Sequence, residues 1–274
     1  MNENNHWLQS DFLMNIFNEV HLKINHAYFG TVPEFKGLNT LPINRLYLAL
    51  ETCGTIQWGK QKEINLTPGS ITFMPYNIPL SYSFQPGKMI AFHFNIEIFP
   101  NSDLFYGERN CLQLHNQQIC ENVFETIKNC KNINDILSIQ QNLILLSSKF
   151  LDKDFSFYSK HLGLIKKHKR LINYIDHNLD ANLTVDSVAT YLDFTRDQLS
   201  KSFKRDLGFP LKKYISHLII RKASEQLLLN KSVKEVADEL KFSSQFYFSR
   251  FFKKHTNISP SLYKVSIEHN VPVN

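Results

Sequence analysis

Short apolar runs separated by turn residues dominate the chain between about residues 39 and 99. The runs lie at residues 45–52, 55–58, 63–66, 70–74, 78–84 and 89–99. Pro and Gly separate them, because Pro ends strand pairing and Gly accepts the positive φ of a tight turn. In the last run, Ile90, Phe92 and Phe94 fall on one face of the strand. His93 and Asn95 fall on the other face. This pattern predicts a small β barrel or sandwich.

The pattern changes to a helical one after these strands. Apolar residues at spacings of three and four predict helices at residues 119–131 and 133–150. The next dozen residues show no clear period, and the chain beyond them is helical to about residue 266. We therefore expect an α+β protein with two domains. Their expected bounds are 1–151 for a β barrel with trailing helices, 152–164 for a linker and 165–274 for an all-α domain.

The helical part contains an internal repeat, in which residues 183–214 resemble residues 231–263. Three residues of the first copy (Ala189, Leu192, Phe194) match Ala237, Leu240 and Phe242 of the second. Five more (Leu199, Phe203, Lys204, Gly208, Tyr214) match Phe248, Phe252, Lys253, Asn257 and Tyr263. One residue inserted in the second copy accounts for the change of offset between the two sets.

Each copy has the sequence features of a helix-turn-helix motif. A small residue, Ala189 or Ala237, stands where two helices would cross. The second helix would begin at a hydroxyl residue, Thr195 in one copy and Ser243 or Ser244 in the other. Two segments fit the capping-box pattern, Thr195-x-x-Gln198 and Ser232-x-x-Glu235. Gly208 and Asn257 stand where a helix would end in the left-handed region.

A long helix, at residues 211–229, is expected between the two copies. It would begin after Pro210 and end at Asn230. At ~1.5 Å per residue it would hold the two motifs about 28 Å apart. Successive major-groove faces of B-DNA are ~34 Å apart. One chain could therefore place both second helices in adjacent grooves on one side of a duplex.

The net charge of +6 is unevenly distributed along the 274 residues. Residues 1–159 carry 11 Lys and Arg against 14 Asp and Glu, a net charge of −3, and residues 160–274 carry 20 against 11, a net charge of +9. A mildly acidic part joined to a basic part favours a polyanionic partner for the basic part. A solubilising charge bias is the alternative that charge by itself leaves open.

Other sequence features exclude several classes of protein. The longest apolar runs fall well short of the ~20 residues that a membrane span needs. The N-terminus lacks the basic start and apolar segment of an export signal. The four cysteines form no CxxC pair, and no Gly-rich phosphate loop, GxSxG or HExxH motif is present. We expect a cytoplasmic protein that is not an enzyme and needs no cofactor.

At the doubled motif the chain resembles the AraC/XylS family of bacterial transcription regulators. The resemblance covers about residues 165–266 and includes Arg221-Lys-Ala223 and the tail FSSQFYFSRFFKKHTNISPSLY at residues 242–263. Family members usually have Gly before the aromatic residue of the turn, where this chain has Asp193 and Lys241. If that position needs positive φ, both residues are modestly strained.

The resemblance extends to the N-terminal part. LTPGSITFMPYNIPLSY at residues 66–82 and AFHFN at residues 91–95 are similar to the family's cupin-like effector domain. It implies a regulator of transcription that binds double-stranded promoter DNA, responds to a small-molecule effector and forms a homodimer through the trailing helices. A sugar is one candidate for the effector, and RNA polymerase is a further candidate partner.

Two sets of residues are expected to contact DNA. The candidates for contact with base edges lie near the start of each second helix: Arg196, Asp197, Ser200, Lys201, Gln245, Phe246, Ser249 and Arg250. The candidates for contact with phosphate are Thr195, Lys204, Arg205, Ser244, Lys253 and Lys254. The alternative for each is solvated helix surface. Asp197 suits the role least, because a carboxylate repels phosphate and accepts only from cytosine N4. The aromatic residues at helical spacing are interpreted as core.

Five residues are expected to bind the effector, namely Arg45, Trp58, Tyr82, His93 and Asn95. If the apolar face of run 89–99 packs on the trailing helices, its polar face lines the barrel. The alternative is an outward polar face with a structural histidine. A metal site is not expected, because His93 is the single histidine in the predicted strands.

Two other functions remain open at this point. One is a regulator whose barrel forms dimers without binding a ligand. The other is a cupin enzyme with a basic helical appendage, which the lack of clustered metal ligands disfavours.

Overall fold

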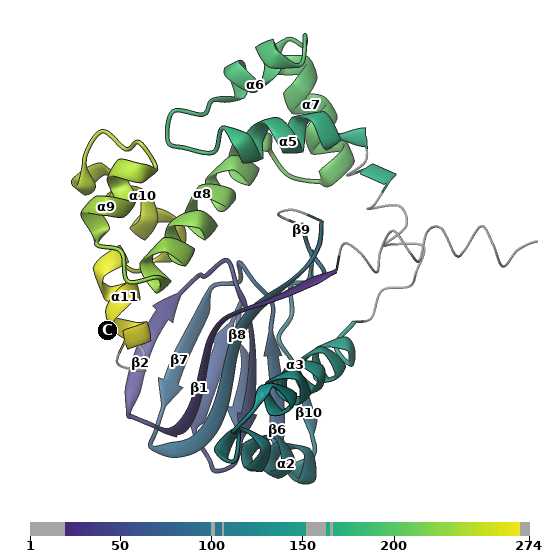
Figure 1. Cartoon of the computed structure of the whole chain (residues 1–274), viewed down its shortest axis with the longest axis vertical. Coiled ribbons are helices and arrows are strands. Elements are labelled where there is room, and N and C mark those ends of the chain that lie inside the picture. The colour runs from purple at the N-terminus through teal and green to yellow at the C-terminus, as the bar shows by residue number, and fades with distance from the viewer. Residues whose placement is uncertain (1–19, 100–101, 106, 152–162, 165–166, 269–274) are drawn as a thin grey trace, which may run out of the picture.

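The structure is a computed structural model that describes residues 20–99, 102–105, 107–151, 163–164 and 167–268. A β-rich half precedes a helical half, which confirms the predicted α+β organisation (Figure 1). Most of the predicted linker falls on residues 152–162, which are outside the described residues. The domain boundaries expected from the sequence therefore stay predictions.

Two antiparallel sheets form the β half. One has the strand order β1-β8-β3-β6-β10 with β9 beside β8, and the other has the order β2-β7-β4-β5. Because the two sheets do not close into one ring, the predicted barrel is an open pair of layers. The strands are β1 (His21–Val32), β2 (Phe35–Asn39), β3 (Asn44–Ala49), β4 (Gly54–Trp58), β5 (Lys62–Leu66), β6 (Ser70–Met74), β7 (Leu80–Phe84), β8 (Gly87–Phe99), β9 (Ser102–Asp103) and β10 (Leu112–His115).

The alternation along β8 sorts its side chains between two cores. Ile90, Phe92 and Phe94 belong to a hydrophobic cluster that includes Leu143 and residues of both trailing helices. Met89 and Ala91 belong to a second cluster, which joins the inner faces of the two sheets. The predicted helices are α2 (Gln117–Lys128) and α3 (Ile133–Ser148), and Asn116 and Asn132 cap their N-termini. The apolar face of β8 therefore packs on the trailing helices, and its other face points between the sheets.

Four strands were not predicted from the sequence, namely β1, β2, β9 and β10. The longest of them, β1, pairs with β8, but its register shifts between Ile24 and His26. Such a bulge moves the later side chains to the opposite face, so the sequence does not alternate with period two over the whole strand. β1 is also an edge strand with many exposed positions, which lowers its apolar content.

The helical half consists of two helix-turn-helix motifs on either side of one long helix. The helices are α5 (Lys169–His177), α6 (Val185–Tyr191), α7 (Arg196–Leu207), α8 (Leu211–Leu228), α9 (Val233–Glu239), α10 (Gln245–Thr256) and α11 (Pro260–Glu268). Ala189 and Ala237 are buried at the expected helix crossings. Asn230 follows α8 with a φ of 63° and helps to end it. One hydrophobic cluster runs through both motifs and α8, so they form a single packed unit.

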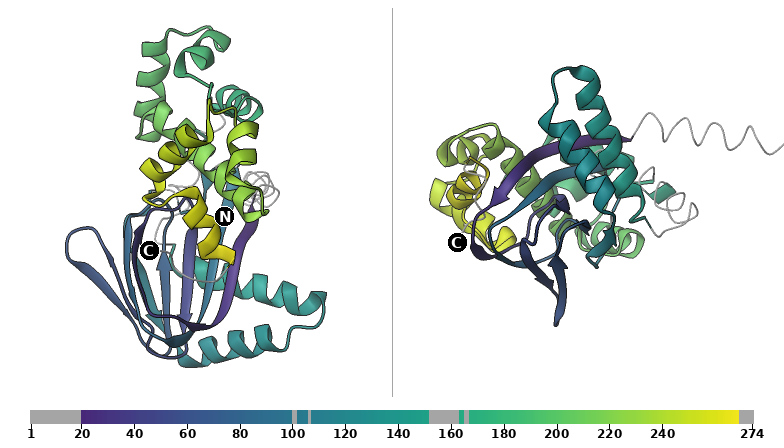
Figure 2. Two further views of the ribbon diagram at one scale, coloured as in Figure 1. Left: turned by 90° about the vertical axis from the view of Figure 1, so that its left-hand side faces the viewer. Right: turned by 90° about the horizontal axis from the view of Figure 1, so that it is seen from below.

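The two halves contact one another directly. Leu41 and Ile43, in the connection from β2 to β3, are buried in the hydrophobic cluster of the helical half. Beside them, the Thr40 amide donates to the carbonyl of Thr256, at 2.8 Å. On the other side of the junction, Arg221 of α8 forms an ion pair with Glu97 of β8, with 2.6 Å between Nη1 and Oε1. The helical half therefore lies against one end of the sheets (Figures 1 and 2).

Candidate nucleic-acid interface

The second helix of each motif begins at a capping hydroxyl, as expected. The Thr195 hydroxyl accepts from the amide of Gln198, whose side chain accepts from the Thr195 amide in return. In the second motif, Ser244 is the capping residue, and it accepts from the Tyr247 amide. No capping box forms in this motif, because the position holds Tyr247 in place of the Glu or Gln whose side chain reaches back to the cap amide. In each motif the cap therefore fixes the residue at which the second helix begins, and the first turns of that helix lie at the protein surface.

The predicted base-contacting residues lie together on the outer face of each second helix. Ser200 and Ser249 are half-buried, and the other members of the set are exposed. In α7, Arg196 forms an ion pair with Asp186 of α6, with 3.0 Å between Nη1 and Oδ2. Asp197 stands in the first turn of α7, where a carboxylate stabilises the positive end of the helix dipole. This gives Asp197 a structural reason to be there.

The outer face of α10 carries an aromatic ring and a guanidinium group. Phe246 is 71% exposed, and Tyr247 beside it is 56% exposed. The Arg250 guanidinium carbon lies 5.7 Å from the centre of the Phe246 ring, in cation–π contact. This contact limits the conformations of Arg250 and holds its five N–H donors at the surface.

Exposed basic side chains extend toward the C-terminal end of each second helix. Lys204 and Arg205 stand in the last turns of α7, and Lys253 and Lys254 in those of α10. Arg205 also donates to Asp206, which accepts from Lys167 and His168 of the preceding segment. These donors, Lys167 first, hold the pKa of Asp206 well below its ordinary value. Asp206 therefore remains ionised and ties the segment before α5 to α7.

The turn of each motif contains a residue with positive φ. The values are 58° for Asp193 and 54° for Lys241, at the place where the family usually has Gly. Both residues therefore carry the modest strain considered in the sequence analysis. Lys241 also forms an ion pair with Asp180, at 2.8 Å. Both helices end at left-handed residues as expected, with a φ of 79° at Gly208 and 67° at Asn257.

The inner faces of the two sheets form a second candidate site. Alternation places Arg45 beside Tyr47 on β3 and Trp58 beside Ile56 on β4, so both point between the sheets. Arg45 is 1% exposed, and one of its nitrogens donates to the Asn39 side chain at 2.9 Å. Its guanidinium carbon lies 5.9 Å from the centre of the Tyr82 ring.

Several buried polar atoms of this site have no hydrogen-bond partner among the described residues. They are Nη1 of Arg45, Nε1 of Trp58 and the hydroxyl of Tyr82. Buried polar groups are nearly always hydrogen-bonded, because an unpaired group loses its hydrogen bonds to water without forming a new one in the protein. Three such groups on one inner surface indicate a place for a polar ligand or for water.

His93 and Asn95 share the inward face of β8 but have different surroundings. The Tyr47 hydroxyl lies 3.2 Å from Nε2 of His93. Burial, followed by the nearby Arg45 and His26, holds the pKa of His93 well below its ordinary value, so the ring is neutral. The Asn95 amide is hydrogen-bonded to Asn25, to the Pro42 carbonyl and to Asp103. Asn95 therefore shapes the wall of the site, and its polar atoms are already engaged.

Within the described ranges, no group of three or more His, Cys, Asp or Glu side chains is arranged to hold a metal ion. No helix in the same ranges is long and apolar enough to cross a membrane.

Comparisons with known proteins agree with this geometry. A model of a helix-turn-helix domain matches residues 188–265. The transcriptional activator AarP of Providencia stuartii is 34% identical over 97 residues, which are 35% of this chain and 72% of AarP. The chain belongs to the AraC/XylS family of transcription regulators. The lactose operon transcription activator of Staphylococcus xylosus is 31% identical over 136 residues, and the match spans about half of each chain, 48% in both cases.

The fold of the whole chain also occurs in solved structures of other proteins. ToxT of Vibrio cholerae, in a structure with an unsaturated fatty acid bound, has a TM-score of 0.58 and 14% sequence identity, and the match covers 99% of this chain and 100% of that one. At this identity the likeness concerns the fold alone. It shows that the arrangement of a β-rich half followed by a helical half also occurs in another chain.

The structure brings to these sites Tyr47 and a group of basic residues at the junction of the two halves, which the sequence did not assign to them. Tyr47 faces the same space as Arg45, and strand alternation by itself would have found it two positions along β3. Basic residues at the junction of the two halves, including Arg109 and His217, lie on segments more than 100 positions apart in the chain. No local pattern connects such segments, so this group could not be predicted.

Proposed function

We propose that this chain regulates transcription by inserting α7 and α10 into two adjacent major grooves of promoter DNA. The observation that carries the proposal is that both motifs and α8 share one hydrophobic core. A shared core holds the two second helices in a fixed relation, and α8, with 18 residues at ~1.5 Å each, spans about 27 Å. The base-contacting and phosphate-contacting residues named above remain part of this proposal.

Footprinting of the full chain on the promoter next to its own gene tests this arrangement. One protomer should protect two major-groove faces spaced by about one helical turn, ~10–10.5 bp. A footprint limited to one groove per protomer would contradict docking of the two motifs as a rigid pair.

The proposal includes control by a small polar effector held between the sheets. The buried donors of Arg45 and Trp58 and the Tyr82 hydroxyl would bind the oxygen atoms of such a ligand. The lactose, raffinose and arabinose operons appear in the names of relatives, which supports a sugar. The ToxT structure with a bound fatty acid supports ligand binding by this fold. A barrel that serves dimerisation alone is the other outcome.

A thermal-melting screen of the full chain against sugars and sugar acids tests the effector site. A ligand should raise the melting temperature, because it binds the folded state. His93→Ala should abolish that rise while the protein stays folded, and His21→Ala, at an exposed position of β1, should leave it unchanged. If a ligand stabilises the His93→Ala variant as well as the parent chain, His93 has only a structural role.

We further infer that the protein forms a homodimer through α3. Apolar side chains on its outer surface are 44–64% exposed, at Ile133, Ile136, Leu137, Ile144 and Leu145. An exposed apolar patch of this kind on a helix favours association with a second copy. Leu137→Glu should give a monomer in analytical ultracentrifugation. We expect a cytoplasmic, non-enzymatic regulator, and contact with RNA polymerase would depend on how the dimer is placed on the promoter.

A further inference from the structure

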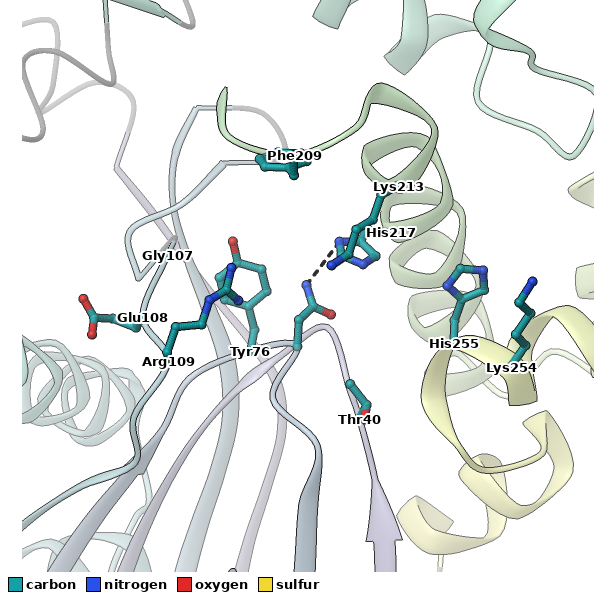
Figure 3. A pocket seen from close by; sticks show the side chains of 11 residues that line it. Thr40, Tyr76, Gly107, Glu108, Arg109, Phe209, Lys213, His217, Lys254 and His255 are labelled. Atoms are coloured by element: carbon teal, nitrogen blue, oxygen red, sulfur yellow. Dashed lines mark hydrogen bonds between the residues drawn. The ribbon is translucent and has the colours of Figure 1, made fainter. Parts of the chain in front are cut away.

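A cavity of about 240 Å³ lies where the two halves of the molecule meet (Figure 3). Its walls come from the connection between β6 and β7, from the loop before β10, and from α8 and α10. Tyr76 and Asn77 represent the first wall, and Arg109 the second. Lys213 and His217 point into it from α8, and Lys254 and His255 lie on α10 (Figure 3). A ligand here would touch both halves at once.

The charged groups that line this junction cavity are mostly basic. Arg109, Lys213 and Lys254 carry full positive charges, against one carboxylate, that of Glu108. Figure 3 shows the Glu108 side chain directed away from His217 and Lys213. Among the described residues, none of the three cations has a carboxylate partner within ion-pair distance. Converging cations without a counter-ion create a positive potential that attracts an anion.

The pKa values of the two imidazoles in the cavity, those of His217 and His255, are lowered by burial and by the nearby positive charges. Burial, then Lys213, His255 and Arg109, lowers the pKa of His217 to about 4. Burial, then Lys254 and Lys213, also lowers the pKa of His255. Both rings are therefore neutral at neutral pH. The Asn77 amide nitrogen lies 3.4 Å from Nδ1 of His217, so Nδ1 accepts and the ring proton sits on Nε2, where it can be donated to a ligand.

We propose that the junction cavity binds a compact polyanion, a small molecule carrying phosphate groups or several carboxylates. The cations of Arg109, Lys213 and Lys254 would neutralise its charge, and neutral His217 would donate one hydrogen bond to it. The volume suits a molecule smaller than most drug-sized ligands. The site lies outside the space between the sheets, and its binding does not depend on the function proposed above.

Binding at this site would oppose binding of DNA. Lys254 lines the cavity and is also one of the candidate phosphate contacts of α10. One ammonium group cannot neutralise the ligand and a DNA phosphate to the full extent at the same time. The ligand would also add to the contacts that already hold α8 and α10 on the sheets, such as Asn257 to Thr40 at 2.9 Å. By linkage, DNA would weaken ligand binding by the same factor. This second step rests on the proposed DNA interface.

Isothermal titration calorimetry of the full chain tests the site with two probes, pyrophosphate and citrate, at constant ionic strength. At least one probe should bind with a dissociation constant below about 1 mM. Preference for pyrophosphate would identify a phosphorylated ligand, and preference for citrate a polycarboxylate. Lys213→Gln should weaken binding by about tenfold or more, because a hydrogen bond to a charged group is lost. Lys212→Gln is the matched control, since Lys212 is the preceding exposed residue of α8 and does not line the cavity.

The result that would overturn the site is equal weakening by the two substitutions, or no binding of either probe. Equal weakening would mean general attraction to a basic surface. Both lysines are exposed, so neither substitution is expected to unfold the chain, and melting curves will verify this.

A second experiment separates the site from its coupling to DNA. Fluorescence anisotropy with a random 30-bp duplex should show weaker DNA binding when the better probe is present. Lys213→Gln should reduce this effect at the same probe concentration, because it weakens ligand binding and keeps Lys254 for DNA. If the probe binds but DNA affinity is unchanged, the cavity is a binding site and the competition at Lys254 is wrong.

Discussion

The two helix-turn-helix motifs of this chain share their backbone conformation and helix caps but differ in many of their other side chains. Both have a buried alanine at the helix crossing, a positive φ in the turn, a hydroxyl cap and a left-handed helix end. These features are requirements of backbone geometry and hydrogen bonding, and few residue types satisfy them. The other side chains are under no such restriction, and there the two motifs diverge.

The aromatic residue of the turn shows the divergence most clearly. Phe242 is 7% exposed, and its ring lies 5.2 Å from that of Phe248 and 5.3 Å from that of Phe251. Phe194, its counterpart in the repeat, is 53% exposed. The residues that correspond to Phe248 and Phe251 in the first motif are Leu199 and Ser202, which give Phe194 less to pack against. The match between Phe194 and Phe242 in the sequence is therefore not a match in burial.

The motifs also differ in what surrounds their exposed arginines. Arg196 of the first motif is held by the carboxylate of Asp186, whereas Arg250 of the second lies over the ring of Phe246. A carboxylate neutralises the charge that a DNA base or phosphate would meet, and an aromatic ring leaves it available. The second motif is also the one whose helix end contacts the sheets, through Asn257 and Thr256. We infer that the second motif contributes more to base recognition and is more closely coupled to the β half.

The largest difference is expected in stability, between Phe242→Ala and Phe194→Ala. Phe242→Ala should lower the free energy of unfolding by about 3–5 kcal/mol, because it leaves a cavity in a packed core. Phe194→Ala should lower it by under ~1 kcal/mol, because half of the ring is already in water. Chemical denaturation of the full chain, followed by circular dichroism, measures both values. Equal losses would show that the first motif buries its aromatic ring in solution.

The next effect concerns DNA binding by the two arginines. Arg250→Ala should cost ~1–3 kcal/mol on the site found by footprinting and relax discrimination at one base position, because its donors suit guanine O6 and N7. Arg196→Ala should cost less, because its charge is already paired with Asp186. Titrations with the footprinted site and with a random duplex measure affinity and discrimination together. If Arg250→Ala weakens both duplexes equally, Arg250 contacts phosphate and the asymmetry between the motifs is wrong.

A smaller effect is expected when the strained turn residues are replaced by glycine. Asp193→Gly should raise the free energy of unfolding by about 0.5–1 kcal/mol, since glycine adopts positive φ without steric cost. Lys241→Gly should give a smaller gain, because it also removes the ion pair with Asp180. The denaturation assay measures both changes, with Lys241→Ala as the control that removes the ion pair and keeps the strain. A loss of stability on Asp193→Gly would contradict the strain assigned to this turn.

The smallest difference is expected between Lys204 and Lys253, which occupy equivalent places in the two motifs. Each replacement by Ala should weaken binding to all sequences about equally and lower the slope of log K against log salt by about one. Titrations at several salt concentrations measure the slope. A change of slope for Lys253→Ala and none for Lys204→Ala would show that only the second motif contacts the DNA backbone.

The helical half was largely predictable from the sequence, and the reason is its repeat. Because the same caps and helix ends occur in both copies, each copy supports the interpretation of the other. The sequence by itself therefore predicts the structural roles of Thr195, Gly208 and Asn257. In the β half, the alternation in β8 correctly sorted its two faces, but the bulge in β1 concealed that strand. The exact packing of the turn aromatics depends on neighbours that the repeat does not preserve, and so the exposure of Phe194 was not predicted.

The candidate sites were predictable to different degrees for the same physical reason. Residues on one helix face or one strand face follow from the period of the element, which predicts the outer faces of α7 and α10 and places His93 with Asn95 on one face of β8. Whether that face of β8 points inward or outward depends on the fold. Contacts between elements, such as Asp186 with Arg196, require the fold. The junction cavity requires it most, because its walls come from several separate parts of the chain, from Thr40 to His255.

The connection between β2 and β3 has a practical consequence for dissecting the molecule. Leu41 and Ile43 belong to the core of the helical half, although they precede α5 by more than 100 positions in the sequence. Burial of each such side chain is worth about 1.5–3 kcal/mol. A fragment that begins at α5 would therefore expose to water the apolar surface that these two side chains cover, and it would aggregate more readily than the full chain. In a chimera that joins this helical half to a different sensor domain, residues 40–43 would have to be transferred together with the helical half, although in this chain they connect two strands of the β half.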